Sequence, residues 1–204
     1  ILVSIINVYH VLIMDKYSEK IDLNGKFLIA MPGMGDPRFK NAVIYLCSHN
    51  TEGTMGLIIN KLAANFNISD LLKQLSIKPT KIVEPFPIFL GGPVEPYRGF
   101  ILHSLDYFNK EETIQIDNIL GMTSTLDIVE DIVTNKGPET FFVALGYTGW
   151  DAGQIEMEIK NNGWLVSDAK IDIIFQKNNK SKWEDSLKIL GVDPKFLSAD
   201  GGTA

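Results

Sequence analysis

The chain has 204 residues, of which 45% are hydrophobic and 22% are charged, and these proportions are those of a globular domain with an ample core. Its formal net charge of −6 disfavours nucleic-acid binding, because such binding relies on an excess of basic residues that release counterions. The single cysteine excludes an internal disulfide framework and is typical of a reducing cytoplasm.

The first 13 residues are apolar, but they lack the basic segment and the small-residue cleavage site of a signal peptide. A transmembrane helix needs about 20 apolar residues, and Asp15 and Lys16 interrupt the run before that length. We therefore expect residues 1–13 to be an over-extended start, Met14 to be the native one, and residues 14–204 to form a single domain without membrane association.

The next stretch predicts three strands. Residues 27–31 form a continuous apolar run, which is typical of a strand buried on both faces, and Pro32 ends it. Two further apolar runs, 42–48 and 54–60, are joined by a turn that ends on Gly53. The short spacing predicts that these two strands form a hairpin.

Cys47 and His49 lie two residues apart on the predicted strand and would share one of its faces. A thiol and an imidazole on one face could act as nucleophile and base, or form half of a metal site. A zinc site would have to recruit carboxylates such as Asp36. The simpler interpretation is a buried thiol that acts as a small hydrophobic group and a hydrogen-bonded histidine at a strand end. We expect neither a metal nor another cofactor.

The middle of the chain predicts a short helix, a proline-punctuated connection and three strands. In chain order, we expect the helix over 67–75, the connection over 77–87, and the strands over 86–90, 99–103 and 113–116. The last strand alternates polar and apolar residues, as expected at the edge of a sheet.

The glycine-rich segment over 91–99 has two interpretations. Two successive glycines can direct backbone N–H groups toward an anion, and Arg98 could bind a phosphate or carboxylate. The segment lacks the spacing of nucleotide-binding glycine motifs, and Glu95 would repel an anion. The alternative is a tight turn that allows close backbone packing, with Arg98 paired to Glu95 or Asp106.

The last third of the chain mixes helices and strands. We expect helices over 123–135, 154–161 and 181–190, strands over 140–145, 164–167 and 171–175, a turn over 146–153 and a solvated basic loop over 177–182. Ser124 with Asp127 and Ser181 with Glu184 have the spacing of capping boxes, and Gly191 suits a helix C-cap. The element order predicts an α+β (mixed α/β) fold with a largely antiparallel sheet, barrel-like or bifurcated, flanked by helices.

Four ordered blocks carry a family resemblance. They are Gly25-Lys26-Phe27-Leu28-Ile29-Ala30-Met31-Pro32 with Asp36, Phe39, Val43, His49, Gly53, Gly56, Leu57 and Asn60; Gly91-Gly92-Pro93-Val94 with Arg98-Gly99-Phe100-Ile101-Leu102-His103; Gly146-Tyr147-Thr148-Gly149-Trp150 with Gly153-Gln154-Ile155-Glu156 and Glu158; and Trp164-Leu165 with Trp183, Gly202 and Ala204. Through these blocks the chain, from about residue 23 to its end, resembles the bacterial AlgH/YqgE family, also called UPF0301 or DUF179. The resemblance implies a compact, cytoplasmic, mixed α/β protein without an established activity, and it supplies no catalytic residues. One branch of the family has been called a transcriptional regulator of alginate synthesis.

Two functional hypotheses follow. The first is a non-enzymatic regulatory or interaction protein, a monomer or weak homodimer, with an exposed apolar groove near residues 91–103 that binds another protein. Any effect on transcription would be indirect, because the helix expected over 123–135 carries three acidic residues that DNA would repel. The alternative is a small-molecule-binding protein or unrecognised hydrolase with a polar pocket at strand ends.

The candidate groove draws on residues at the ends of strands and in turns. They are Asp36, His49, Asn60, Gly91, Gly92, Arg98, His103, Trp150 and Gln154. Trp150 either lines a small pocket or closes the end of the core. We assign no residue a catalytic role, and lean toward a protein that is not an enzyme.

Overall fold

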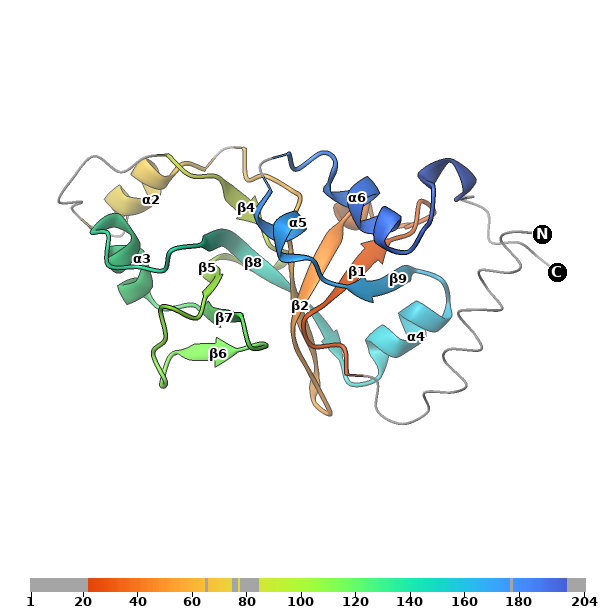
Figure 1. Ribbon diagram of the computed structural model, residues 1–204, viewed down its shortest axis with the longest axis horizontal. Coiled ribbons are helices and arrows are strands. Elements are labelled where there is room, and N and C mark those ends of the chain that lie inside the picture. The colour runs from red at the N-terminus through yellow and green to blue at the C-terminus, as the bar shows by residue number, and fades with distance from the viewer. Residues whose placement is uncertain (1–21, 65, 75–76, 78–84, 177, 198–204) are drawn as a thin grey trace.

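A computed structural model describes residues 22–64, 66–74, 77, 85–176 and 178–197 (Figure 1). The expected over-extended start over 1–13 and most of the expected connection over 77–87 lie outside these residues. Among the described helices, none combines the length and the apolar character needed to cross a bilayer.

The described strands form one curled, mostly antiparallel sheet. Their order across it is β6 (Thr113–Gln115), β7 (Leu120–Thr123), β5 (Val94–Ser104), β8 (Phe141–Asp151), β3 (Gly53–Ile58), β2 (Val43–Asn50), β1 (Lys26–Ala30) and β9 (Trp164–Asp168). A short strand, β4 (Ile88–Leu90), lies off this path and pairs parallel with β8. The sheet curls into a half-barrel, which confirms the predicted α+β class and its largely antiparallel, barrel-like sheet.

β8 runs through the centre of the sheet and changes partners along its length. Its residues 143–145 pair with β4, whereas residues 148–151 pair with β3. Between them Gly146 has a φ of +69°, a left-handed conformation that favours glycine. The turn expected over 146–153 covers only residues 152 and 153, because the strand continues past this glycine to Asp151.

The glycine-rich segment crosses β8 at this bend. A Cβ on Gly91 would lie 2.2 Å from the carbonyl oxygen of Gly146, and one on Gly92 would lie 2.1 Å from the carbonyl of Tyr147. The two chains can approach this closely only because no side chain separates them. This confirms the interpretation of the segment as a site of close backbone packing.

Helices cover both faces of β1, as its continuous apolar run predicts. Phe27 and Ile29 pack in a cluster with residues of α5 (Ile171–Phe175) and α6 (Lys182–Ile189). Leu28 and Ala30 pack on the opposite side with residues of α4 (Gln154–Lys160). Figure 1 shows α4 on one side of β1 and β9, and α5 with α6 on the other.

A third cluster fills the other half of the molecule, where α2 (Ile68–Gln74) and α3 (Leu126–Val133) pack on β5 and β8. The expected helix over 123–135 begins three residues late, because Thr123 belongs to β7. The N-cap is Thr125 and makes no side-chain capping bond, so the predicted capping box at Ser124 is wrong.

Residues 171–175 form a helix, and the predicted strand is wrong. The run is rich in β-branched residues, which favour a strand locally. In the structure the amides of Ile173 and Ile174 bond back to the carbonyl of Lys170, and Ile174 is fully buried against the sheet. Tertiary packing therefore overrides the local propensity.

The basic loop expected over 177–182 is not fully solvated, because its last residue is the first residue of α6. This residue, Lys182, is 1% exposed and donates from Nζ to the carbonyls of Ile59 and Ile174, both at 2.8 Å. The ammonium also lies 5.0 Å from the ring centre of Phe89, and burial lowers the pKa of Lys182 to about 8.

Of the two predicted ends of α6, the N-terminal capping box is wrong and the C-terminal glycine is confirmed. Ser181 is the N-cap but makes no side-chain capping bond, so this capping box is also wrong. Gly191 follows the helix with a φ of +68°, as a C-cap glycine should. The short η2 helix (Pro194–Phe196) follows, and the described part of the chain stops one residue later, at 197.

Candidate functional site

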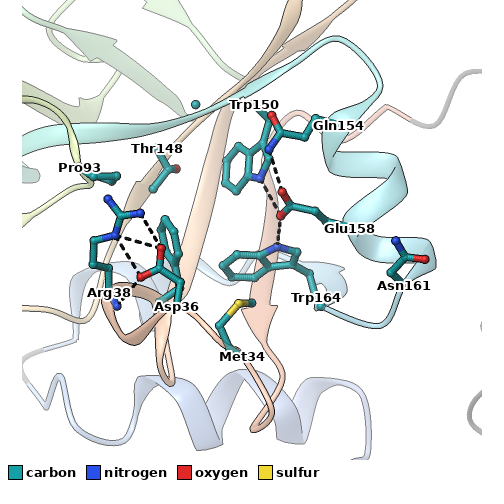
Figure 2. A pocket seen from close by; sticks show the side chains of 13 residues that line it. Met34, Asp36, Arg38, Pro93, Thr148, Trp150, Gln154, Glu158, Asn161 and Trp164 are labelled. Carbon is teal, nitrogen blue, oxygen red and sulfur yellow. Dashed lines mark hydrogen bonds and ion pairs between the residues drawn. The ribbon is translucent and has the colours of Figure 1, made fainter. Parts of the chain in front are cut away.

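A pocket of about 450 Å³ lies between the loop of η1 (Pro37–Phe39), the end of β8, α4 and the start of β9 (Figure 2). We call it the tryptophan pocket. It is lined by Met34, Asp36, Arg38, Phe39, Pro93, Thr148, Gly149, Trp150, Gln154, Glu158, Asn161, Gly163 and Trp164. Its size is that of a small-molecule site, since such sites span roughly 300–1,000 Å³.

Two tryptophans form one wall of the pocket, and one carboxylate holds both. The indole N–H groups of Trp150 and Trp164 donate to the same oxygen of Glu158, at 3.0 and 2.8 Å. The rings lie 6.0 Å apart at an angle of 84°, and Phe39 meets the ring of Trp164 edge-on. Figure 2 shows Glu158 beside the N–H edges of both indoles. The aromatic wall is thus fixed before any ligand binds.

Glu158 is itself fixed by its own helix. Gln154, one turn earlier on α4, donates from Nε2 to the second oxygen of Glu158 at 2.9 Å. The carbonyl of the Gln154 side chain accepts from the backbone N–H of Asp151 at 3.0 Å, which ties the helix start to the end of β8. Gly153 lies in the turn between Asp151 and Gln154 and has a φ of +75°. This left-handed conformation favours glycine at that position.

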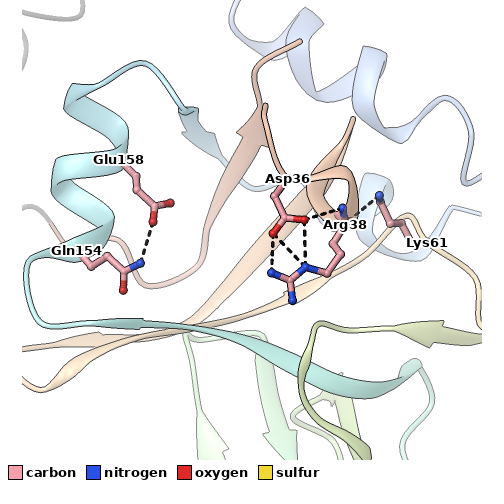
Figure 3. A network of polar contacts seen from close by, with 5 residues as sticks. All are labelled: Asp36, Arg38, Lys61, Gln154 and Glu158. Atoms are coloured by element: carbon pink, nitrogen blue, oxygen red, sulfur yellow. Dashed lines mark hydrogen bonds and ion pairs between the residues drawn. The ribbon is translucent and has the colours of Figure 1, made fainter. Parts of the chain in front are cut away.

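Asp36 and Arg38 form the opposite wall (Figure 3). The guanidinium donates to both carboxylate oxygens, with the shortest contact at 2.6 Å, and the backbone N–H of Arg38 adds a further bond. These bonds hold the pKa of Asp36 below its usual value. Lys61 stabilises the same loop by donating from Nζ to the backbone carbonyl of Arg38 at 2.7 Å.

Several polar groups of the pocket already have partners within the protein. Both oxygens of Glu158 accept hydrogen bonds, Asp36 is ion-paired, and the hydroxyl of the buried Thr148 donates to the carbonyl of Gly56 at 2.9 Å. The described residues that line the pocket include no serine, cysteine, lysine or histidine. This arrangement can accept a flat apolar group between the walls, but it presents no nucleophile with a base beside it.

Three of the predicted groove residues, Asp36, Trp150 and Gln154, meet in the pocket. The two alternatives for Trp150 both hold: it packs in the core beneath α4, and it also lines the pocket. The predicted Gly91 and Gly92 lie just before the pocket residue Pro93, where they pack against β8 and take no part in the lining.

The four remaining predicted residues lie outside the pocket, and they are Arg98, His103, Asn60 and His49. Arg98 pairs with Glu95 at 3.0 Å, as the packing interpretation expects, and also donates to Ser124. His103 is fully buried, bonds to the hydroxyl of Thr123 at 2.9 Å, and has its pKa lowered by burial.

Asn60 hydrogen-bonds backbone groups at the end of the β2–β3 hairpin. Its side-chain oxygen accepts from the backbone N–H of Val43 at 3.0 Å, and its nitrogen donates to the carbonyl of Asn41 at 2.8 Å. Asn60 therefore satisfies backbone groups of β2 and the loop before it. It contributes nothing to the lining of the tryptophan pocket.

Cys47 and His49 do not share a face, contrary to the sequence expectation. Cys47 is buried in the core beside Tyr45, and burial raises the pKa of its thiol. A bulge in β2 between residues 46 and 48 turns the strand. His49 consequently bonds to Thr54 at 2.8 Å and lies 3.6 Å from Glu156 on α4, which covers the other face. The described residues contain no group of three or more side chains suited to a metal.

Sequence reasoning missed Arg38, Glu158 and Trp164 as pocket residues. Glu156 and Glu158 lie two residues apart on α4 and have different neighbours, since the first contacts His49 and the second accepts from the indoles. A signal was available in the helical spacing of Gln154 and Glu158 together with a tryptophan on either side of that helix.

Comparisons with known proteins agree with this fold. A family model described as AlgH-like matches residues 27–195. A UPF0301 protein from Ruegeria pomeroyi is 52% identical over 185 residues, which cover 90% of this chain and all of that protein. A UPF0301 protein from Jannaschia is 47% identical over 184 residues, which cover 90% of this chain and 96% of that protein.

Two solved structures are similar along most of the chain. The solution structure of AlgH from Pseudomonas aeruginosa has a TM-score of 0.74 and 35% identity, and the match covers 92% of this chain and 100% of that one. A crystal structure of a protein from Corynebacterium diphtheriae shares the fold, with a TM-score of 0.68 and 17% identity over 86% of this chain and 91% of that one. The chain belongs to the AlgH-like (UPF0301) family, as the four sequence blocks indicated.

Proposed function

We propose that the protein is a non-enzymatic, cytoplasmic binding protein that acts in regulation by recognising a ligand or partner group in the tryptophan pocket. The observation that supports this is the shared bonding of Trp150 and Trp164 to Glu158. Aromatic side chains provide large apolar contact areas, and fixing them in advance lowers the entropy cost of binding. A pocket with this wall is prepared to bind an apolar group.

Binding fits the polar groups better than catalysis does. Asp36 and Glu158 are the carboxylates of the pocket, and both already accept hydrogen bonds from their neighbours. A general base must be free to take a proton from a substrate. The meeting of Asp36 with Gln154 in one cavity still favours a small molecule as a second candidate for the ligand.

Regulation through direct contact with DNA has little support. The helix α3 carries Asp127, Glu130 and Asp131, which phosphate groups would repel, and the whole chain has a net charge of −6. An effect on transcription would therefore pass through the bound ligand or partner.

Ligand-observed NMR with the simple probes indole, benzoate and benzylamine tests this function. At least one probe should bind the wild type, and Met34→Trp should weaken its binding tenfold or more by filling the pocket. The matched control is Met157→Trp, because Met157 lies exposed on α4 outside the pocket. Absence of binding, or equal binding by both variants, would contradict the proposal.

A second assay tests the proposal that the protein is not an enzyme. Wild-type protein should not accelerate hydrolysis of 4-nitrophenyl acetate or 4-nitrophenyl phosphate above the buffer rate. Turnover that Met34→Trp abolishes and Met157→Trp preserves would show that the pocket is an active site and would overturn this part.

A further inference from the structure

A second hollow, of about 480 Å³, lies beside the tip of the β2–β3 hairpin. We call it the hairpin hollow, and its walls include Glu52, Met55, Val94, Tyr147 and Asp151. It differs from the tryptophan pocket in its charge, because Glu52 and Asp151 are exposed acids and no basic residue lines it among those that the structure describes.

The two cavities meet at Gly149 and Trp150, which line both. Gly149 is exposed and has no side chain that could separate the cavities, and an added Cβ would lie 3.3 Å from the ring of Tyr147. Pro93 lines one cavity and Val94 the other. The glycine-rich segment, where the sequence predicted a partner groove, therefore runs along both.

The strand beneath this junction has an edge without a partner strand among the described residues, although the backbone N–H of Asp151 at its end already donates to the side chain of Gln154. Residues 148–151 of β8 pair with β3 on one side. On the other side the pairing with β5 reaches Tyr147 through Val94 and goes no further among the described residues. An extended peptide can add to such an edge through main-chain hydrogen bonds, with its side chains entering pockets on either side.

We propose that the joined cavities bind a short extended segment of a partner protein, with an aromatic or large apolar side chain in the tryptophan pocket and a basic side chain in the hairpin hollow. This inference rests on the proposed function and names its partner class. The aromatic wall selects the first side chain, and the acids Glu52 and Asp151 select the second. The net charge of −6 favours a basic partner over an acidic one.

Calorimetry with capped model peptides tests the inference. The peptides carry one Phe and one Lys, separated by one to four Ala residues, in both orders. The best of them should bind at least tenfold tighter than its Lys→Glu version and than its Phe→Ala version. Because charge attraction is screened by salt, the preference for Lys should shrink as ionic strength rises.

A matched pair of glycine variants locates the binding site. Gly149→Val places a side chain at the junction and should weaken the best peptide tenfold or more. Gly99→Val is the control, because Gly99 is also a strand glycine, has open space around its Cβ position, and lies outside both cavities. It should change the affinity less than twofold, and circular dichroism of both variants checks the fold.

A second variant isolates the charge. Glu52→Gln with Asp151→Asn should remove the preference for Lys over Glu while the Phe side chain still contributes. Equal binding of Lys and Glu peptides by the wild type would overturn the inference, yet it would leave the proposed function intact if the aromatic probes bind. If neither peptides nor aromatic probes bind, both proposals fail. If only the aromatic probes bind, and Gly149→Val does not affect them, a small-molecule ligand is favoured and the inference of a peptide ligand is overturned.

Discussion

Lys182 donates from its buried Nζ to the carbonyl oxygen of Ile59, 2.8 Å away and 123 positions earlier in the chain. The same ammonium donates to the carbonyl of Ile174 on α5. A single side chain thereby joins the start of α6 to the residue after β3 and to α5. Its aliphatic stem and charge both lie inside the fold, so the bond links stability to the protonation of one lysine.

Lys182→Met should lower the free energy of unfolding by about 1–3 kcal/mol. Methionine keeps most of the apolar stem, but it leaves the carbonyls of Ile59 and Ile174 without their donor. Urea unfolding at pH 7 measures the change. Lys188→Met is the control, because Lys188 pairs with Asp185 at the surface, and it should change stability by less than about 1 kcal/mol. A variant at Lys182 that is as stable as the wild type would contradict the structural role of the ammonium.

Stability should also depend on pH through Lys182. Burial lowers its pKa to about 8 in the folded chain, against 10.5 for an unperturbed lysine. Between these two values the unfolded chain binds more protons than the folded one, so stability rises with pH. Below about pH 8 both states are protonated, and the penalty for the buried charge is present in full.

The difference between wild type and Lys182→Met isolates this effect from other titrating groups. At about 1.4 kcal/mol per pH unit, it should shift by about 3 kcal/mol in favour of the wild type from pH 7.5 to pH 10.5. Urea unfolding of both proteins across that range gives the comparison. A difference that stays constant with pH would show that the lysine does not lose its proton within the fold.

Glu158→Ala should destabilise the protein by about 2–4 kcal/mol, because it leaves two indole N–H groups of Trp150 and Trp164 without an acceptor. It should also abolish probe binding in the tryptophan pocket. Glu156→Ala, two residues earlier on the same helix, removes only a 3.6 Å contact with His49 and should cost less than about 1 kcal/mol. Similar losses for both variants would argue against a special role for Glu158.

Gly92→Ala should destabilise the fold by more than about 3 kcal/mol, because its Cβ would meet the backbone of Tyr147 at 2.1 Å and backbone cannot move aside as a side chain can. Thermal unfolding measures this loss. The control is Gly99→Ala, whose Cβ meets nothing within 4 Å, and which should stay within about 1 kcal/mol of the wild type. Equal stability of the two variants would show that the crossing at β8 can open.

Local sequence patterns were sufficient for several elements. The apolar run over 27–31 predicts a strand buried on both faces, and β1 is such a strand. The turn ending at Gly53 predicts the β2–β3 hairpin, which the pairing of those strands confirms. These elements depend on interactions between residues close in sequence, where periodicity and turn chemistry are visible. The ordered blocks likewise carried the family resemblance.

Tertiary structure decided the rest. Residues 171–175 have strand propensity, but the burial of Ile174 against the sheet makes them a helix. Lys182 follows a polar segment, and only the packing of α6 places it between two distant carbonyls. The cavity itself joins Asp36, before β2, to Gln154, on α4. No local pattern relates those two residues. Their proximity arises because β9 pairs with β1 and β8 pairs with β3, so that sheet pairing over long separations, not sequence neighbourhood, builds the site.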